Sequence, residues 1–516
     1  MRAFAIAGGW LLMVGMAGAV LAAEPDPEHA LVLHQRSRVE HPPGSGQFEV
    51  AWNVVRWDAR KTAIVICDMW NQHWCKGATA RVAEMAPRMN ELVKAARRRG
   101  VLVIHAPSGT MDAYKDTPQR KLAQQAPTVE PKVALKGWCR LDPQREPPLP
   151  IDDSDGGCDD EPRCPSGHSW TRQIETLEIH EGDAISDSAE VYYLLQQRGI
   201  ENLIVMGVHT NMCVLGRPFG IRQMVYQGKN VVLVRDMTDT MYNSRRPPHV
   251  SHFRGTDLVI EHIEKHWCPT ITSSDLLGGA AFRFKDDKRP HVVFVSHEDE
   301  YQSEKTLPRV AQRLADRHGY ACTMLVGHGD RGVPGLEELA TADVLVLYAR
   351  RKSLPKEQMA MLRAYLEAGK PLVALRTSSH AFAIRGALPP GHEQWATFDG
   401  DVLGGNYHGH GPNQLGADVS IAPEAAGHPI LAGVAPAAWH SQGSLYYASP
   451  IDPRATVLLR GSAGGKTEPV AWTRTYQGGR VFYTSLGHAD DFSQAPFQTL
   501  LSNAISWAMK GAESKR

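Results

Sequence analysis

The stretch GVHTNMCV at Gly207–Val214 decides the fold of the first half of the chain. It continues a short apolar run, 202–206, that has the length and composition of a buried strand. A strand that ends in a glycine and leads into a helix is typical of a doubly wound α/β sheet, in which chemistry is usually placed at the carboxyl ends of the strands. Cys213 then begins the next helix, where a helix N-terminus lowers the pKa of a thiol. We interpret Cys213 as a candidate nucleophile.

A carboxylate follows a second strand-like run. Thr62–Cys67 (TAIVIC) is rich in β-branched residues, and Asp68 comes directly after it. Because the carboxyl ends of parallel strands lie on one edge of a sheet, we expect Asp68 to lie close to Cys213. A carboxylate in that place can take the thiol proton and so activate the sulfur.

The two segments resemble the isochorismatase-like cysteine hydrolases, a family that includes nicotinamidases. The first strand of that family typically ends in DMQNDF, which Asp68–Trp74 (DMWNQHW) resembles, and a later strand ends in G-V-x-T-x-x-C-V, which Gly207–Val214 resembles. The resemblance covers roughly residues 61–274.

The resemblance implies a mechanism for the first half of the chain. Asp68 would be the base and Cys213 the nucleophile in hydrolysis of a small-molecule amide or a related C–N bond. It also implies a cis peptide between Val208 and His209, and an oxyanion hole made by the backbone N–H groups of His209 and Cys213.

The lysine that completes an Asp-Lys-Cys triad in that family is missing. No lysine lies between Lys136 and Lys229, and the segment that should hold it, 182–190 (GDAISDSAE), has none. Lys136 or Arg172 could fold back to supply the charge. Without such a replacement, the thiol pKa should be higher than in proteins with the triad, and hydrolysis slow with an alkaline-shifted pH profile.

Four polar residues are candidates for the pocket wall: Asn71, His73, His105 and Thr210. The resemblance implies that an aspartate and several histidines could bind a metal, as in nicotinamidases. The Asp-x-His spacing of that family is absent, so we interpret these residues as pocket walls and predict no metal and no cofactor.

An insertion at 137–170 contains three of the eight cysteines and a dense acidic run. In an oxidising compartment we expect a disulfide, first between Cys158 and Cys164 and second between Cys139 and either of them. The remaining cysteines other than Cys213 fit small core residues. The acidic run resembles half of a calcium loop, but a solvated loop is the preferred interpretation. An insertion of this length can act as a lid over the site.

The N-terminus is typical of an exported protein. Residues 1–23 combine Arg2, a long apolar run and small residues at its end, which predicts a cleaved signal peptide and a periplasmic or secreted location. The run is also long enough for an uncleaved membrane anchor, which is the alternative. Residues 24–60 form an N-terminal extension, and 61–278 form the first domain.

A second domain, 291–512, follows a polar linker at 279–290. Strand-like runs alternate with helical patterns, which predicts another parallel α/β layer structure; the runs are His291–Ser296, Asp343–Tyr348 and Pro371–Leu375. The domain resembles the trehalose-utilisation (ThuA-like) family, a branch of the class I glutamine-amidotransferase-like fold. The segments that carry the resemblance are GGNYHGH at 404–410, GHPI at 427–430, EPVAW at 468–472, GGRVFYTSLGH at 478–488 and NAISWA at 503–508.

The turn in which amidotransferases hold a nucleophilic cysteine reads RTSSH here, at 376–380, so glutaminase chemistry is not expected. Ser379 and His380 are neighbours in sequence, and this alone does not make a hydrolytic pair. We expect four side chains to converge on a cleft for a sugar-like ligand: His380, Tyr407, His410 and His488.

The sequence therefore predicts an α/β protein with two three-layer αβα domains and mainly parallel sheets. Equal numbers of acidic and basic residues, 56 each, argue against nucleic-acid binding through bulk charge. The predicted function is hydrolysis of a small molecule, and a homo-oligomer is left open. The alternative is a binding or scaffold protein in which both domains have lost their chemistry, and a third reading has the second domain acting on a modified sugar.

Overall fold

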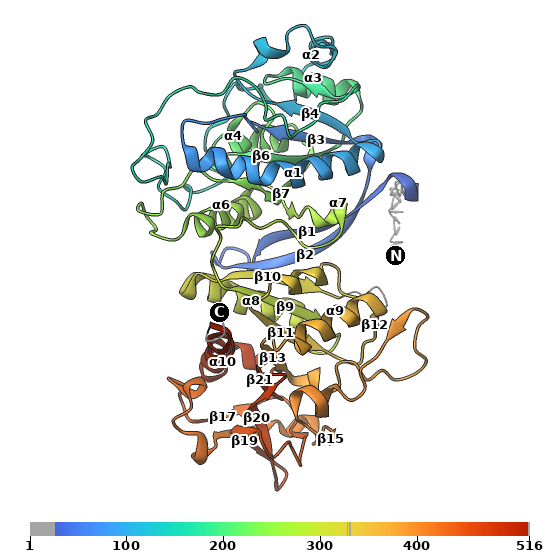
Figure 1. The fold of residues 1–516 in the computed structure, drawn as a ribbon, viewed down its shortest axis with the longest axis vertical. Coiled ribbons are helices and arrows are strands. Elements are labelled where there is room, and N and C mark those ends of the chain that lie inside the picture. The colour runs from blue at the N-terminus through green and yellow to red at the C-terminus, as the bar shows by residue number, and fades with distance from the viewer. Residues whose placement is uncertain (1–25, 328, 330–331, 514–516) are drawn as a thin grey trace, which may run out of the picture.

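Two α/β bodies, each built on its own sheet, follow one another along the chain (Figure 1). This fold is that of a computed structural model, which describes residues 26–327, 329 and 332–513. The predicted signal segment, 1–23, lies outside the described residues.

The first sheet has eight strands in the order β2-β1-β8-β7-β6-β3-β4-β5. All pairings among β3 to β8 are parallel. The strands are β1 (Ala30–Glu40), β2 (Phe48–Asp58), β3 (Thr62–Cys67), β4 (Leu102–Ala106), β5 (Ala184–Ile185), β6 (Asn202–Val208), β7 (Asn230–Asp239) and β8 (Thr270–Ile271). The helices are α1 (Lys76–Arg98), α2 (Pro118–Gln124), α3 (Glu190–Gln197), α4 (Cys213–Gly216), α5 (Ile221–Tyr226), α6 (His252–His266) and α7 (Ser274–Leu277).

Alternating residues of the central strands supply two separate cores. Ile64 and Ile66 of β3 pack with α1 on one face, and Ala63 and Val65 pack with α3, α5 and α6 on the other. This alternation follows from the two-residue period of a strand. The continuous apolar run 62–67 is thus a central strand covered by helices on both faces, as in a three-layer α/β fold.

The N-terminal extension belongs to the first sheet. β1 and β2 form a long antiparallel hairpin, and Arg36 of β1 pairs with Thr270 of β8. Leu31 and Leu33 are fully buried in the same core as α1. The extension predicted at 24–60 therefore contributes two strands to the first sheet.

The second sheet has nine strands in the order β10-β9-β11-β13-β21-β20-β19-β16-β17. They are β9 (His291–His297), β10 (Ala321–Val326), β11 (Val344–Ala349), β13 (Leu372–Leu375), β16 (Ala417–Ile421), β17 (Ala438–Ser441), β19 (Thr456–Ala463), β20 (Lys466–Tyr476) and β21 (Gly479–Thr484). Short strand pairs are β12 (Leu354–Pro355) with β14 (His392–Glu393), and β15 (Gly409–His410) with β18 (Tyr446–Tyr447).

Helices cover both faces of this sheet as well. α8 (Ser303–His318) and α10 (Ala495–Glu513) contribute to the core on one face, and α9 (Lys356–Glu367) to the core on the other. The pairings along β10, β9, β11, β13 and β21 are all parallel. Beyond β21, the strands β20, β19, β16 and β17 extend the sheet with antiparallel pairings. The α/β class is confirmed, with a first sheet that is mainly parallel and a second that is mixed.

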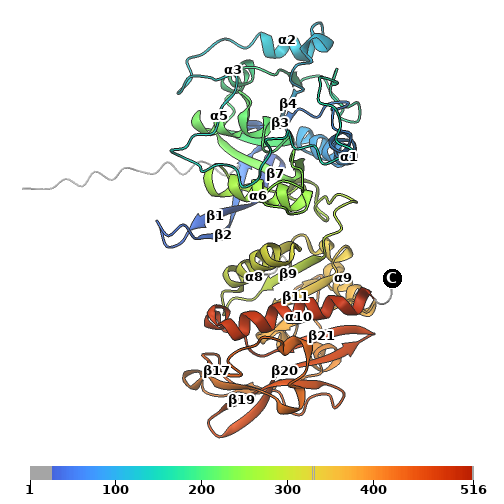
Figure 2. The ribbon, with the colours of Figure 1, turned by 90° about the vertical axis from the view of Figure 1, so that its left-hand side faces the viewer.

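The linker between the sheets is packed against the first body. Arg289 forms ion pairs with Asp257 at 2.6 Å and with Asp287 at 2.8 Å, and Phe284 stacks on Phe253. The two bodies face each other across the β1–β2 hairpin and α8 (Figure 2). Arg254 and Asp316 form an ion pair across this boundary at 2.7 Å.

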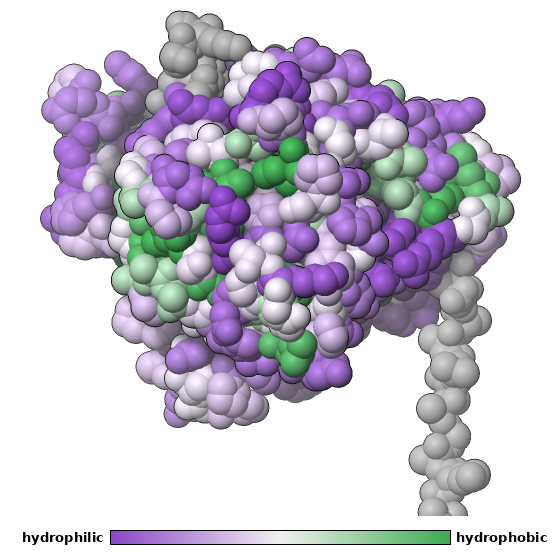
Figure 3. Space-filling view, turned by 90° about the horizontal axis from the view of Figure 1, so that it is seen from below, coloured by the Kyte–Doolittle hydropathy of each residue, from purple (hydrophilic) through white to green (hydrophobic). Residues whose placement is uncertain are grey.

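Among the described residues, no helix has the length and apolar character needed to cross a bilayer. Figure 3 shows the end of the second body that points away from the first. Hydrophilic residues dominate this face, and the hydrophobic ones form several separate groups. Such scattered apolar residues are normal for a solvent-facing surface.

Candidate active site

Asp68 and Cys213 lie together at the carboxyl edge of the first sheet. Strands β3 and β6 are parallel neighbours with Cys67 opposite Gly207, and the Cys213 thiol and the Asp68 carboxyl lie close enough for each to shift the pKa of the other. Gly207 has φ +107°, and a β-carbon there would lie 2.0 Å from the Cys67 carbonyl oxygen. Only glycine therefore lets the end of β6 pass this close to Asp68.

The Asp68 carboxylate is completely buried. Its Oδ1 accepts a 2.7 Å hydrogen bond from the backbone N–H of Ser108, and its Oδ2 lies 3.3 Å from Nε of Arg217. Burial raises the pKa of Asp68 although Arg217 and the hydrogen bonds act in the opposite direction. A carboxyl with a raised pKa is a better proton acceptor when it is ionised, as a general base requires.

Arg217 occupies the place expected of a third catalytic group. It lies four residues after Cys213, one helical turn away, and contacts both the Asp68 carboxylate and the Cys213 sulfur. Lys136 and Arg172, the two replacements named from the sequence, lie elsewhere: Lys136 bonds to Gln223 through its backbone, and Arg172 is exposed.

Sequence reasoning missed Arg217 because it looked for a charge before the cysteine. The i, i+4 spacing on the helix was the available signal. In the segment where a lysine is usual, Ser186 instead donates to Glu190, and Asp187 accepts from the backbone of Gly109.

Burial raises the pKa of the Cys213 thiol well above its ordinary value, and the Asp68 charge raises it further, while Arg217 lowers it. The sequence had suggested a thiol pKa lowered by a helix N-terminus. The helix α4 has only four residues, so its dipole is small, and burial decides the direction. The resting thiol is therefore protonated at neutral pH.

Two backbone N–H groups point to an oxyanion site. The peptide between Val208 and His209 is cis, as the family resemblance implies. Within the described part of the chain, neither the N–H of His209 nor that of Cys213 donates to a protein acceptor. Both groups are thus available to a substrate oxygen.

The predicted pocket residues have different surroundings. His73 lies edge-on to His209, with ring centroids 5.0 Å apart, and burial lowers the pKa of His73 to about 4 and that of His209 to about 3. Both rings are therefore neutral at pH 7. Asn71 binds the backbone at 171–172, so it fastens the segment that follows the insertion.

Two other predicted wall residues are structural. Both ring nitrogens of His105 are engaged, by Gln173 at 2.9 Å and by Asp183 at 3.3 Å. Thr210 forms a 2.7 Å hydrogen bond with Thr238 of β7 and so ties the end of β6 to its neighbour. Both side chains therefore hold neighbouring segments in place, and their role as pocket walls stays a prediction.

Aromatic side chains from the insertion cover the site. Trp170 stacks on Trp70 at 4.4 Å and on His73 at 5.5 Å. Trp138 lies on Gly216, where an added β-carbon would meet its ring at 2.8 Å, and on the Arg217 guanidinium. Cys213 is consequently only 8% exposed. The insertion lies over the site, as a lid would.

The expected disulfide is absent from the described residues, where all eight cysteines are free. The acidic run is also not a solvated loop, because its carboxylates have individual partners. Asp152 pairs with Arg246, Asp153 with Asn211, Asp155 with Asn243, Asp159 with Arg81, and Glu161 with Arg245. These contacts dock the insertion on the first domain, which sequence could not reveal because the partners are distant along the chain.

In the second domain the predicted cleft residues form one aromatic cluster. His380 stacks on Tyr407 at 4.5 Å, and Tyr407 and His410 both pack against Tyr446. His488 contacts Tyr301 at 5.8 Å. Ser379 also hydrogen-bonds to Nδ1 of His380 at 3.1 Å, so these sequence neighbours do meet.

The buried Arg376 joins the two halves of this cluster. Its guanidinium lies 4.3 Å from the ring centroid of Tyr301 and 4.8 Å from that of Tyr446. It donates to the Ser485 carbonyl and to the Tyr301 hydroxyl, and its Nε is buried with no hydrogen-bond partner among the described residues. Sequence reasoning missed Arg376 because it searched this turn for a cysteine.

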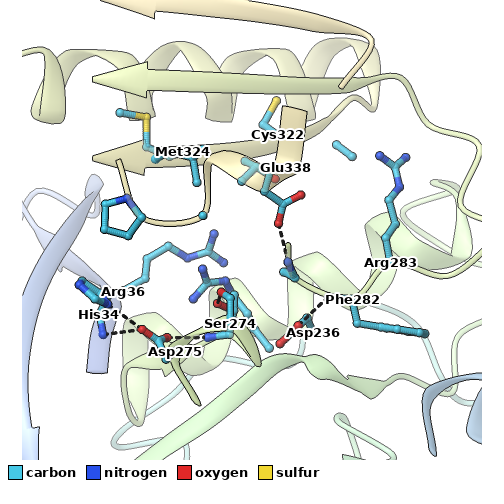
Figure 4. Close-up of a pocket in the computed structure, with 18 of the residues that line it drawn as sticks. His34, Arg36, Asp236, Ser274, Asp275, Phe282, Arg283, Cys322, Met324 and Glu338 are labelled. Atoms are coloured by element: carbon cyan, nitrogen blue, oxygen red, sulfur yellow. Dashed lines mark hydrogen bonds and ion pairs between the residues drawn. The ribbon is translucent and has the colours of Figure 1, made fainter. Parts of the chain in front are cut away.

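A cavity of about 620 Å³ lies between the two bodies (Figure 4). Its acidic residues fix the surrounding backbone: Asp275 binds His34, Asp236 accepts from Phe282 N–H, and Glu338 accepts from Ala281 N–H. It lies apart from both predicted sites, and none of their residues lines it.

Comparisons with known proteins found one matching family model and a number of similar solved structures. Residues 291–508 match the family model described as ThuA, trehalose utilisation. No curated protein matches the chain.

Solved structures similar to the chain include members of both families. A ThuA-like protein from Bacteroides uniformis has 16% identity, covering 44% of this chain and 95% of its own, with a TM-score of 0.33. A cysteine hydrolase from Pseudomonas syringae has 19% identity, covering 43% and 94%, with a TM-score of 0.28. An isochorismatase family protein from Burkholderia thailandensis has 14% identity, covering 42% and 94%, with a TM-score of 0.24.

Proposed function

We propose that the first domain is a cysteine hydrolase that cleaves a small-molecule amide or a related C–N bond. The observation that carries this proposal is the contact between the Cys213 thiol and a buried Asp68, with Arg217 beside both. Two unengaged N–H groups, of His209 and Cys213, add a place for the developing oxyanion.

The reaction proceeds in two steps. Asp68 takes the thiol proton as Cys213 attacks the carbonyl carbon, and the negative charge on oxygen is held by the two N–H groups. Asp68 then returns the proton to the departing amine, which leaves an acyl-thioester. Water, with its proton passed to Asp68, attacks the thioester and releases a carboxylic acid and the free thiol.

Arg217 supplies the positive charge that a lysine supplies in the related families. Its guanidinium favours the thiolate over the thiol, which partly offsets the effect of burial. Because burial still dominates, the proton leaves Cys213 only when a substrate is in place or the pH is high. The proposal therefore includes slow hydrolysis with an alkaline-shifted profile.

A hydrolysis screen on small amides tests this function. Wild type and Cys213→Ala are compared, with Cys268→Ala as a control because Cys268 is also buried but lies far along the chain. The proposal is supported if wild type and Cys268→Ala release acid and amine and Cys213→Ala does not. No turnover, together with a Cys213 that does not react with alkylating agents at alkaline pH, favours the scaffold alternative.

The second domain has its own candidate function, the binding of a sugar-like ligand. The stacked rings of His380 and Tyr407 provide apolar faces, and the hydroxyl and imidazole groups nearby provide hydrogen bonds. Calorimetry with a panel of neutral and acidic sugars, using wild type and Tyr407→Ala, measures this directly. Equal heats for the two proteins would reject the cluster as the binding site.

Export remains part of the proposed function, because the sequence of residues 1–23 is typical of a signal peptide. We expect the mature chain to begin at Ala23 or Glu24, at the end of the small-residue segment. N-terminal mass spectrometry of the protein from its native compartment checks this, and an intact Met1 in membrane fractions would indicate an anchor instead.

A further inference from the structure

Three cysteines surround one carboxylate where the insertion meets α1. The Asp160 Oδ2 lies 3.1 Å from the Sγ of Cys164, 3.3 Å from that of Cys75 and 3.6 Å from that of Cys158. The ligand atoms of Cys75, Cys158 and Asp160 all lie within 4.8 Å of one another. None of these residues belongs to the proposed catalytic group.

Backbone N–H groups of the first turn of α1 are aimed at the same cluster. The Gly77 N–H donates to Asp160 Oδ2 at 3.0 Å, and the Ala78 N–H donates to the Cys75 sulfur at 3.5 Å. The backbone of Lys76 acts on the Cys164 thiol and lowers its pKa, against the effect of Asp160. A β-carbon at Gly77 would meet the Asp160 carboxylate at 3.1 Å, so glycine permits this close approach. Hydrogen bonds of this kind orient and stabilise anionic ligands around a metal ion.

Neutral thiols explain this geometry poorly. Three thiol sulfurs and one N–H group lie within hydrogen-bonding distance of a single carboxylate oxygen, and Cys75 also has Asp159 Oδ1 at 3.9 Å. A whole carboxylate offers only about four acceptor directions on its two oxygens. A cation in the middle removes the conflict, because each sulfur then becomes an anionic ligand. Tetrahedral coordination with metal–sulfur bonds of about 2.3 Å separates the ligand atoms by roughly 4 Å, in keeping with the spacing of Cys75, Cys158 and Asp160. Cys164 joins this group through the 3.1 Å contact of its sulfur with Asp160 Oδ2.

We propose that Cys75, Cys158, Cys164 and Asp160 bind one zinc ion, which fastens the insertion to the N-terminal end of α1. Thiolate-rich sets of four ligands select zinc over hard cations such as calcium or magnesium. With four protein ligands the site is closed, so its role is structural.

The zinc site also supports the wall of the active site. The Cys75 N–H donates to Nδ1 of His73, and His73 in turn contacts Trp170 and His209. Metal binding at Cys75 thus restrains both the lid and the histidine that carries an oxyanion donor. The proposal does not depend on catalysis, because its measurements concern the metal alone.

Metal analysis of the full chain, purified from zinc-containing medium, tests the proposal. We expect about one zinc per chain in wild type and a loss of most of it in Cys158→Ser and Cys164→Ser. Cys139→Ser is the matched control, since Cys139 is a buried cysteine of the same insertion outside the cluster. Equal zinc in wild type and Cys158→Ser would overturn the site.

Cobalt substitution of wild type provides a second measurement that needs no variant. Tetrahedral cobalt bound to thiolates gives intense visible bands and a sulfur-to-cobalt charge-transfer band, and added zinc should abolish them. Gly77→Ala, which keeps all four ligands, should weaken zinc binding about tenfold or more. A disulfide among Cys75, Cys158 and Cys164 in peptides from the exported protein would contradict the proposal.

Discussion

The positive charge beside Cys213 can be tested at a single residue, Arg217. Arg217→Met should raise the pKa of the Cys213 thiol further, because the guanidinium of the wild-type protein favours the thiolate. A rise of one pKa unit lowers the thiolate fraction at a fixed pH about tenfold, and the rate of alkylation by iodoacetamide should fall by the same factor. Arg217→Lys should restore part of the rate, and Arg172→Met, at an exposed position, should leave it unchanged. An unaltered alkylation profile in Arg217→Met would show that the charge comes from elsewhere.

Asp68 should cost the protein stability. Its pKa in the folded protein lies above the ordinary value, so folding favours the protonated form and the ionised form is penalised at pH 7. We expect Asp68→Asn to unfold at the same temperature as wild type or a higher one, while turnover falls at least about 100-fold.

The stability difference between Asp68→Asn and wild type should shrink as the pH falls through the raised pKa, because wild type then carries a neutral carboxyl as well. Thermal unfolding followed by circular dichroism between about pH 4 and pH 8 measures this stability difference. A variant that is much less stable than wild type at pH 7 would mean that the contact with Arg217 outweighs burial.

Part of the site was predictable from sequence because topology places it. Asp68 and Cys213 follow neighbouring parallel strands, and the ends of such strands must lie on one edge. Arg217 and Arg376 were missed because each stands where the family pattern has a different residue or none. The partners of His105, Gln173 and Asp183, could not be predicted because they lie 68 and 78 residues further along the chain.

At the scale of elements, the insertion controls access to Cys213. The Trp70–Trp170 stack contributes about 1 kcal/mol to closure, so Trp170→Ala should open the lid roughly fivefold more often. Reaction of Cys213 with a bulky maleimide should accelerate by that factor. Val133→Ala, at an exposed position in the same long connection, is the control. Equal rates for wild type and Trp170→Ala would mean that other contacts hold the lid.

The arrangement of the insertion could not be predicted, because it depends on contacts between distant parts of the chain. The sequence shows a cluster of carboxylates, and a cluster alone favours a solvated loop. Only the fold shows that Arg81 of α1 reaches Asp159, and that Arg246, which follows β7, reaches Asp152. The antiparallel half of the second sheet was likewise not indicated by the three parallel strand-like runs.

For the whole molecule, we expect limited proteolysis near 284–290 to cut the chain without separating its halves. Lys285 and Lys288 are exposed, so trypsin can reach the linker. The contact between Arg254 and Asp316, with Arg289 bound to Asp257, should hold the two fragments together after the cut. Gel filtration of the nicked protein at physiological salt should give one peak containing both fragments, and two separate peaks would show that the domains are independent.

The β1–β2 hairpin has a practical consequence for expression of the first domain alone. A clone that begins at residue 61, where the family motifs begin, would omit two strands and leave the backbone edge of β8 without its partner. Unpaired strand edges invite association between molecules, so this shorter protein should aggregate. The gene segment to clone must reach upstream of Ala30, which makes the boundary of the folding unit different from the boundary of the recognisable motifs.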